Sequence, residues 1–267
     1  MRQLDCFPSP SGEVSIHEDR QGNRIYLEGS AIQTYARQDG TSLLSYICLM
    51  VDILGPAQNV LALGCAGGSL ATMLHRMGRR VTVVDDNPAS FDIARRYFGM
   101  PADLRCVTAD FREYLADEEM LFDGVAIDIG GPAASFESLF DAKSCAALRA
   151  RLSAQGRLAM NLIVPSRKDR LADHIAALLT GDGASTWIYD QEGETDFNTV
   201  LARLPGDDPG DFRGDIGNIV IDPLPWTRRR ARMLGRLRYA RKVRAVDRAE
   251  RHLIDLAVRA LFSSDKG

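Results

Sequence analysis

A glycine-rich turn and three acidic positions each follow a short apolar segment of the chain. The turn, Gly64 to Gly68, comes after VLAL, and the acids that end the later segments are Asp85 with Asp86, Asp110 and Asp128. Glycines let a backbone approach a ligand closely, and free N–H groups at the start of the following helix favour an anionic group such as a carboxylate. A carboxylate about 20 residues beyond such a turn can accept hydrogen bonds from both hydroxyls of a ribose. The pattern therefore indicates a nucleotide site.

Each of these features also has a simpler explanation. A glycine turn can join a strand to a helix without any ligand, and an aspartate at a strand end can cap the next helix. A dinucleotide-binding loop is a further alternative, although the GxGxxG pattern is only approximated here. Acids at successive segment ends favour a nucleotide site, with Asp110 placed to accept from an adenine amino group and Phe111 as a face for the ring. The residues expected to bind the nucleotide are Gly64, Cys65, Ala66, Gly67, Gly68, Asp85, Asp86, Asp110, Phe111 and Asp128.

The segments that carry these residues alternate between two kinds. Apolar runs without polar alternation are each followed by an amphipathic stretch, which predicts a parallel sheet covered by helices on both faces. Ligands of such sheets bind beyond the carboxyl ends of the strands, where the strand order reverses. The expected strands are 59–64, 79–86, 104–110, 122–130 and 157–165, and the expected helices are 69–78, 89–99, 111–120 and 143–156.

Further elements flank this core. Residues 13–37 indicate a β-hairpin or small meander, and apolar residues at helical spacing predict a helix over 42–53. We also expect a helix at 167–181, and closing strands or irregular segments at 185–191, 198–206 and 218–226. The predicted organisation is an N-terminal β-hairpin module (1–40), a nucleotide-binding domain (41–226) and a basic C-terminal helix (227–267).

The C-terminal segment differs from the rest of the chain in charge. Between Arg228 and Arg251 there are eleven Lys or Arg residues and two acids, so with a net charge of -3 the remainder of the chain carries about -12. Apolar residues spaced three or four apart from Met233 to Ala260 predict a long amphipathic helix. We expect this helix to pack on the acidic body or in a homodimer, and nucleic-acid binding is the less favoured alternative.

The composition excludes several classes of protein. Apolar residues at 45% and charged residues at 26% are ordinary values for a globular chain. No run approaches the roughly 20 apolar residues of a membrane helix, and the N-terminus lacks a signal-peptide layout, so we expect a cytoplasmic protein with no membrane partner. The five cysteines include no CxxC pair, which argues against a disulfide framework and a zinc site, and no metal is expected.

Several of these segments together resemble a known family. GCAGGSLA resembles the first motif of class I S-adenosylmethionine-dependent methyltransferases. VVDDNPASFDIARRYFG, CVTADFREYL and FDGVAIDIGGP are similar, in order and spacing, to spermidine synthase and its relatives. IYLEGSAIQ resembles the short β element with a glutamine that precedes the main domain there. The resemblance covers residues 25–165, and its most specific part is 88–98.

The resemblance implies an α/β fold with a mostly parallel, methyltransferase-like (Rossmann-like) sheet of seven strands behind a small N-terminal β module. It also implies an adenosyl ligand, either S-adenosylmethionine or its decarboxylated form, with Asp85 on the ribose, Asp110 on the adenine and Asp128 near the sulfonium-bearing chain. Gln33 is the expected substrate-binding residue, and Asp128 and Tyr46 are the candidate catalytic residues for proton removal.

The departures from spermidine synthases concern charge. Gly67 stands where those enzymes carry an acid in the glycine loop, and Gly131 stands where they carry a second carboxylate after Asp128. A diamine acceptor bound without opposing carboxylates forfeits several kcal/mol of charge-assisted interaction. The sequence therefore favours methyl transfer from S-adenosylmethionine to a small-molecule acceptor. Aminopropyl transfer is the first alternative, and a non-catalytic adenosyl-nucleotide-binding or nucleic-acid-binding protein is the second.

Overall fold

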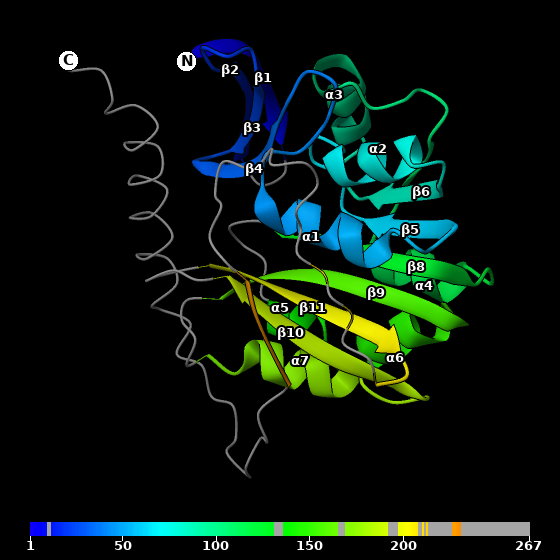
Figure 1. Ribbon diagram of the computed structural model, residues 1–267. Coiled ribbons are helices and arrows are strands. Elements are labelled where there is room, and N and C mark those ends of the chain that lie inside the picture. The colour runs from blue at the N-terminus through cyan, green and yellow to red at the C-terminus, as the bar shows by residue number, and fades with distance from the viewer. Residues whose placement is uncertain are drawn as a thin grey trace.

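The computed structural model describes residues 1–9, 12–130, 136–164, 169–191, 197–207, 210, 212 and 226–230, and it contains two sheets (Figure 1). The N-terminal sheet is an antiparallel meander of four consecutive strands, which extends the predicted meander by one strand at its start. These strands are β1 (Arg2–Ser9), β2 (Gly12–Glu18), β3 (Arg24–Glu28) and β4 (Ala31–Ala36). Their buried residues pack against α3 (Ala89–Phe98), so this N-terminal module lies next to the main domain.

The main sheet has eight strands in the order β12-β10-β11-β9-β8-β5-β6-β7. Strands β9, β8, β5, β6 and β7 are parallel, and β11, β10 and β12 are each antiparallel to their neighbours. The predicted mostly parallel sheet is confirmed, with one strand more than expected. The strands are β5 (Asn59–Leu63), β6 (Arg80–Asp85), β7 (Arg105–Thr108), β8 (Phe122–Ile127), β9 (Leu152–Val164), β10 (Ala184–Gln191), β11 (Phe197–Pro205) and β12 (Trp226–Arg230).

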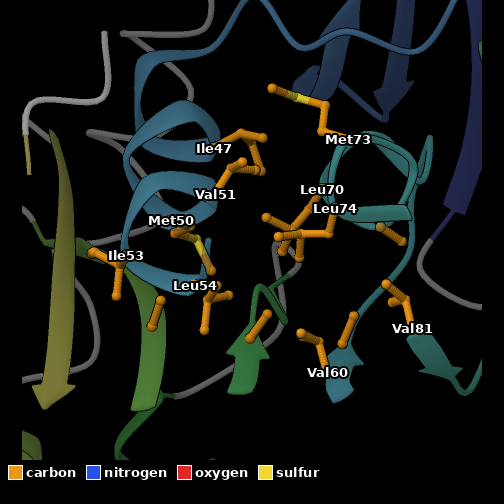
Figure 2. Packing of buried hydrophobic residues seen from close by; sticks show 14 of the residues in the cluster. Ile47, Met50, Val51, Ile53, Leu54, Val60, Leu70, Met73, Leu74 and Val81 are labelled. Carbon is orange, nitrogen blue, oxygen red and sulfur yellow. The ribbon is translucent and has the colours of Figure 1, made fainter. Parts of the chain in front are cut away.

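Helices cover both faces of this sheet, and each face has its own apolar cluster. One cluster is formed with α1 (Ser45–Leu54), α2 (Ser69–Arg76) and α3, and the other with α4 (Phe111–Asp117), α6 (Ala142–Ala150) and α7 (Leu171–Leu179). A short helix, α5 (Phe136–Leu139), precedes α6. Figure 2 shows Ile47 and Val51 of α1 facing Leu70 and Leu74 of α2, with Val60 of β5 near them. Helices on both sides explain why the apolar residues of β5 and of Val125–Ile127 in β8 follow one another without polar alternation.

The strand order reverses beside β5. The chain moves from β5 outward to β6 and β7, and it then returns to place β8 on the other side of β5. In an open parallel sheet this reversal leaves a crevice beyond the carboxyl ends of the two central strands. Gly64 follows β5 and Asp128 follows β8, so the predicted site residues lie at this crevice.

Two predicted helices differ from the structure. The helix expected over 143–156 ends at Ala150, because Leu152 already belongs to β9 and pairs with Phe122. The basic helix expected from residue 227 is wrong at its start, since Trp226–Arg230 is strand β12, paired antiparallel with β10. The rest of that helix and the strand expected at 218–225 lie outside the described residues.

None of the helices among the described residues is long and apolar enough to cross a membrane.

Candidate functional site

A cleft of about 380 Å³ lies at the carboxyl ends of the central strands. The turn after β5 and the ends of β6, β7 and β8 form one side, and residues of the N-terminal module form the other. Eight of the ten residues expected to bind a nucleotide line this cleft, namely Gly64, Cys65, Ala66, Asp85, Asp86, Asp110, Phe111 and Asp128. Gly68 lines a smaller adjoining pocket of about 20 Å³, and Gly67 is turned toward the N-terminal module.

The glycines of the turn are required by close backbone approach. Gly64 has a φ of 95°, and a Cβ there would lie 2.2 Å from the carbonyl oxygen of Asp128. Gly68 has a φ of 69°, where an added Cβ would lie 2.7 Å from Met100 Sδ. Both positions therefore need glycine for the fold itself, since other residues rarely adopt this conformation and have no room here.

Most N–H groups of the turn already have acceptors inside the protein. Gly64 donates to Val84 O (2.9 Å), Cys65 to Asp85 Oδ2 (2.7 Å), Gly67 to Thr34 Oγ1 (2.9 Å) and Gly68 to Cys65 O (2.7 Å). Among the five turn residues, only Ala66 has an N–H without an acceptor in the described part of the chain. Thr34 and Asp85 thus occupy donors within the turn itself, and the expectation that N–H groups at the start of the following helix receive an anionic group stays a prediction.

Asp85 is held by backbone donors. Its Oδ2 accepts from Cys65 N and its Oδ1 from Asn87 N at 2.9 Å, and the Ser90 side chain also hydrogen-bonds to this carboxylate. Burial raises the pKa of Asp85, the two backbone hydrogen bonds oppose this shift, and the neighbouring Asp86 adds to it. Asp86 is exposed and lines the same cleft.

Asp110 caps helix α4. Its side chain accepts from Arg112 N (2.7 Å) and forms a bidentate pair with the Arg112 guanidinium, with distances of 3.1 Å to Nε and 2.8 Å to Nη2. The hydrogen bond from the Arg112 side chain is the main reason that the pKa of Asp110 is lowered. Phe111 is buried, with its ring centroid 5.7 Å from that of Phe140. The structure thus shows the capping role for Asp110, and its role toward adenine stays a prediction.

Asp128 is held by two neutral donors. Tyr46 OH donates to Oδ2 at 3.3 Å, and Asn161 Nδ2 donates to Oδ1 at 3.1 Å. Burial raises the pKa of Asp128 to about 6, and both hydrogen bonds oppose this shift. The carboxylate is ionised at neutral pH and keeps one lone pair on each oxygen for a ligand. The two predicted catalytic residues are therefore in contact, with Asp128 lining the cleft.

The N-terminal module contributes the opposite side of the cleft. Gln33 lines it as predicted, and its Nε2 lies 3.5 Å from Glu28 Oε2. Ser9 Oγ donates to the other oxygen of Glu28 at 3.1 Å, and Tyr26 also lines the cleft. An amide and a carboxylate thus face the strand ends.

Sequence reasoning missed several residues of this site. Asn161 is the one amide within the apolar run RLAMNLIVP, and a polar residue in a buried strand is a signal that could have found it. Thr34 contacts Gly67, which is 33 positions further along the sequence, and Glu28 is the last residue of β3. No local pattern predicts these two contacts.

The cleft is strongly acidic. Five carboxylates line it, from Glu28, Asp85, Asp86, Asp110 and Asp128, against the one guanidinium of Arg112. Arg112 is paired with Asp110 at 2.8 Å, so it neutralises charge within the lining. A low-dielectric cleft lined by one sign of charge attracts ligands of the opposite sign. The arrangement is suited to a cationic ligand and repels an anionic one.

Comparison with known proteins supports the fold. No family model matches the chain. A crystal structure of a probable spermidine synthase from Corynebacterium glutamicum superposes with a TM-score of 0.70 at 12% identity, over 89% of this chain and 99% of that one. Spermidine synthase from Thermotoga maritima superposes with a TM-score of 0.63 at 18% identity, over 82% of this chain and 78% of that one.

Curated relatives match a shorter stretch. Nodulation protein S of Rhizobium tropici is 34% identical over 73 residues, which is 27% of this chain and 30% of that protein. The ubiquinone biosynthesis O-methyltransferase of Methylocella silvestris is 39% identical over 69 residues, which is 25% of this chain and 26% of that protein. The matched stretch is thus less than a third of the length of either relative. Together with the superpositions, these matches confirm the predicted resemblance at the level of the fold, which is the spermidine synthase-like, methyltransferase-type α/β fold.

Proposed function

We propose that the cleft binds an adenosyl sulfonium compound and that the protein is an S-adenosylmethionine-dependent transferase. The observation that carries this proposal is the acidic lining at the strand-order reversal, with five carboxylates around a cleft of about 380 Å³. A dinucleotide carries a pyrophosphate, which needs free N–H donors and tolerates few carboxylates. The glycine turn here has one unengaged N–H, and the lining is negative. These features disfavour a dinucleotide.

The residues present fit an adenosyl group. The Asp85 carboxylate lines the cleft and would accept from the ribose hydroxyls, and Asp110 with Phe111 lies one strand further along for the adenine. Asp128 and Gln33 lie on opposite sides of the cleft near the turn, where they would hold the amino and carboxylate ends of a methionyl chain. When bound, the sulfonium supplies an electrophilic carbon for direct displacement.

Proton removal falls to Asp128. With a pKa of about 6 the carboxylate is ionised at neutral pH, and one of its oxygens would hold the donor's amino group while the other accepts the proton of the acceptor. Tyr46 and Asn161 fix its orientation from two sides, so the protein can align a nucleophile with a base that does not need to move.

Methyl transfer to a small molecule is our first candidate reaction. A Cβ at Gly67 would lie 2.7 Å from Thr34 Cγ2, so the turn has no room for an added carboxylate toward a second ammonium. Aminopropyl transfer from the decarboxylated donor is the second candidate. It is favoured by the count of five carboxylates, because that donor carries more positive charge than S-adenosylmethionine.

Calorimetric titration tests the proposal with S-adenosylmethionine, its decarboxylated form, methylthioadenosine and NAD⁺ in parallel. We expect S-adenosylmethionine to bind at least as tightly as the decarboxylated form, methylthioadenosine to bind more weakly, and NAD⁺ to give no heat. Tight binding of NAD⁺ would overturn the proposal. A strong preference for the decarboxylated form, or spermidine formation from putrescine, would shift the reaction to aminopropyl transfer. Binding with no turnover of any acceptor would identify a non-catalytic nucleotide-binding protein.

A further inference from the structure

A groove of about 840 Å³ lies at the end of the main sheet opposite the cleft. It is lined by the first residues of β5, β6 and β7 and by the segment after α2. Three arginines reach it from two separate parts of the chain, Arg79 and Arg80 before β6 and Arg105 at the start of β7. The acid in its lining is Asp103, which lies 3.6 Å from His75 Nε2. The groove is thus basic on a body that is acidic overall.

These arginines differ from others in the described chain. Most described arginines donate to a carboxylate or a carbonyl oxygen, as in the pair of Arg149 with Asp182. Four have a guanidinium that makes neither a hydrogen bond nor an ion pair with another described residue, and these are Arg37, Arg79, Arg80 and Arg105. Three of the four line this one groove. Arg79 is also partly buried, and its Nε is shielded from solvent without an acceptor.

The fold alone does not explain this cluster. Basic residues near the end of α2 interact favourably with the helix dipole, which accounts for Arg76 and in part for Arg79. Arg105 comes from another strand, so the dipole of α2 gives no reason for its position. Like charges placed together repel one another unless an anion lies between them.

The chemistry of the groove indicates the anion. Guanidinium groups present planar forks of N–H donors that match phosphate oxygens, and a groove lined by three of them suits a phosphate better than a single carboxylate. Met120, with 44% of its surface exposed, and Val81 add apolar contact beside the arginines. We infer that this groove binds phosphate ester groups, supplied either by a small phosphorylated compound or by a nucleic-acid strand. The site is separate from the cleft and does not depend on the proposed transfer reaction.

The double variant R80Q/R105Q tests this inference, with R37Q as its matched control. Arg80, Arg105 and Arg37 are all exposed, and none makes a hydrogen bond or an ion pair with another described residue, so the melting temperature should change little. Arg105 and Arg37 each have one longer-range electrostatic partner, Glu118 and Asp39 respectively, so the variant and its control lose similar interactions. Full-length proteins are titrated with inorganic pyrophosphate by calorimetry and with a fluorescein-labelled single-stranded oligothymidylate by anisotropy. The basic segment 228–251 contributes equally to every variant, so the difference between variants is the measured quantity.

We expect R80Q/R105Q to weaken binding by about tenfold or more and R37Q to change it by less than about twofold. For the oligonucleotide, the slope of log affinity against log salt should fall by about 0.7 for each lost contact. Weakening with both probes would identify a nucleic-acid site, and weakening with pyrophosphate alone would identify a site for a small phosphorylated compound. Equal losses in R37Q, binding that R80Q/R105Q leaves intact, or no binding of either probe would overturn the inference.

Discussion

The protein buries carboxylates in two regions and holds them by different means. In the cleft, Asp128 accepts from the neutral side chains of Tyr46 and Asn161. Behind β10, Asp173 and Asp190 share the guanidinium of Arg229, at 2.7 Å and 2.5 Å respectively. A buried ion needs compensation of its charge as well as of its hydrogen bonds.

The difference separates a binding carboxylate from a structural one. The Arg229 cluster is complete within the chain, because the cation and both anions come from α7, β10 and β12. At Asp128, Tyr46 and Asn161 donate hydrogen bonds, but no cation is paired with the carboxylate in the described part of the chain. Burial therefore raises the pKa of this carboxyl to about 6. A cation that enters the cleft can supply the missing charge. Asp85 is similar, because it accepts hydrogen bonds from two neutral backbone N–H groups and burial raises its pKa.

The largest effect is expected from Arg229→Leu, which leaves the buried Asp190 without its cation and Asp173 with only the more distant Arg170, at 3.7 Å. Removing one partner of a buried ion pair costs about 3 to 5 kcal/mol, and Asp173 has no exposed surface to relieve the cost. Urea denaturation should report this loss in the free energy of unfolding. Arg230→Leu is the matched control on the same strand, since it removes an ion pair with the exposed Asp207 and a contact with the Trp187 ring without leaving a buried carboxylate unpaired. Equal losses in the free energy of unfolding for the two variants would show that the buried carboxylates do not depend on Arg229 for stability.

The next effect concerns ligand affinity rather than stability. Asp85→Ala should weaken S-adenosylmethionine binding at least tenfold, because each charge-assisted hydrogen bond to a ribose hydroxyl contributes about 1.5 to 3 kcal/mol. Asp86→Ala removes an exposed neighbour of the same charge and controls for general electrostatics. Calorimetry measures both. Unchanged affinity in the Asp85 variant would show that the ribose lies elsewhere.

Asp128→Asn should reveal the cost of holding an uncompensated carboxylate. Burial raises the pKa of Asp128 from 3.8 to about 6, so between these pH values the folded state binds more protons than the unfolded state. Stability of the native protein therefore falls as pH rises through this window. The stability of the variant relative to wild type should increase by about 2 kcal/mol from pH 4 to pH 7. Denaturation at both pH values measures this, and a difference that does not change with pH would contradict it.

The sequence predicts much of this fold and part of the site. Apolar runs and amphipathic stretches placed β5 to β8 and α2 to α4 close to their observed bounds, because helices and parallel strands impose strong local periodicity. Aspartates at strand ends were found for the same reason, since topology alone gathers the strand ends at one edge of the sheet.

What the sequence could not predict depends on contacts between distant residues. Residues 227–230 of β12 were assigned to the basic helix because the helical spacing of apolar residues further along was extended back to them. Their strand form is stabilised by the pairing of Arg229 with Asp173 and Asp190 and by the contact of Arg230 with the Trp187 ring, 3.7 Å from its centroid. The hydrogen bond from Gly67 N to Thr34 Oγ1 joins the predicted N-terminal module to the predicted nucleotide-binding domain. Neither segment contains a local pattern that predicts this contact.

Asn161→Leu gives the smallest and most specific effect. The Nδ2 group favours ionised Asp128, so its loss should raise the pKa of that carboxyl above about 6. A hydrogen bond contributes about 1 kcal/mol, which corresponds to a shift of somewhat less than one pH unit. Affinity for a cationic donor increases as Asp128 ionises, so the midpoint of the pH dependence of S-adenosylmethionine binding should move to higher pH.

Thr199→Val is the matched control, because Thr199 Oγ1 donates at 3.1 Å to Asp190, a buried carboxylate that already has its arginine. Both variants lose one buried hydrogen bond, and only Asn161→Leu should move the midpoint. A shift of the same size in Thr199→Val would show that the pH dependence reports general loosening of the sheet and not the charge on Asp128.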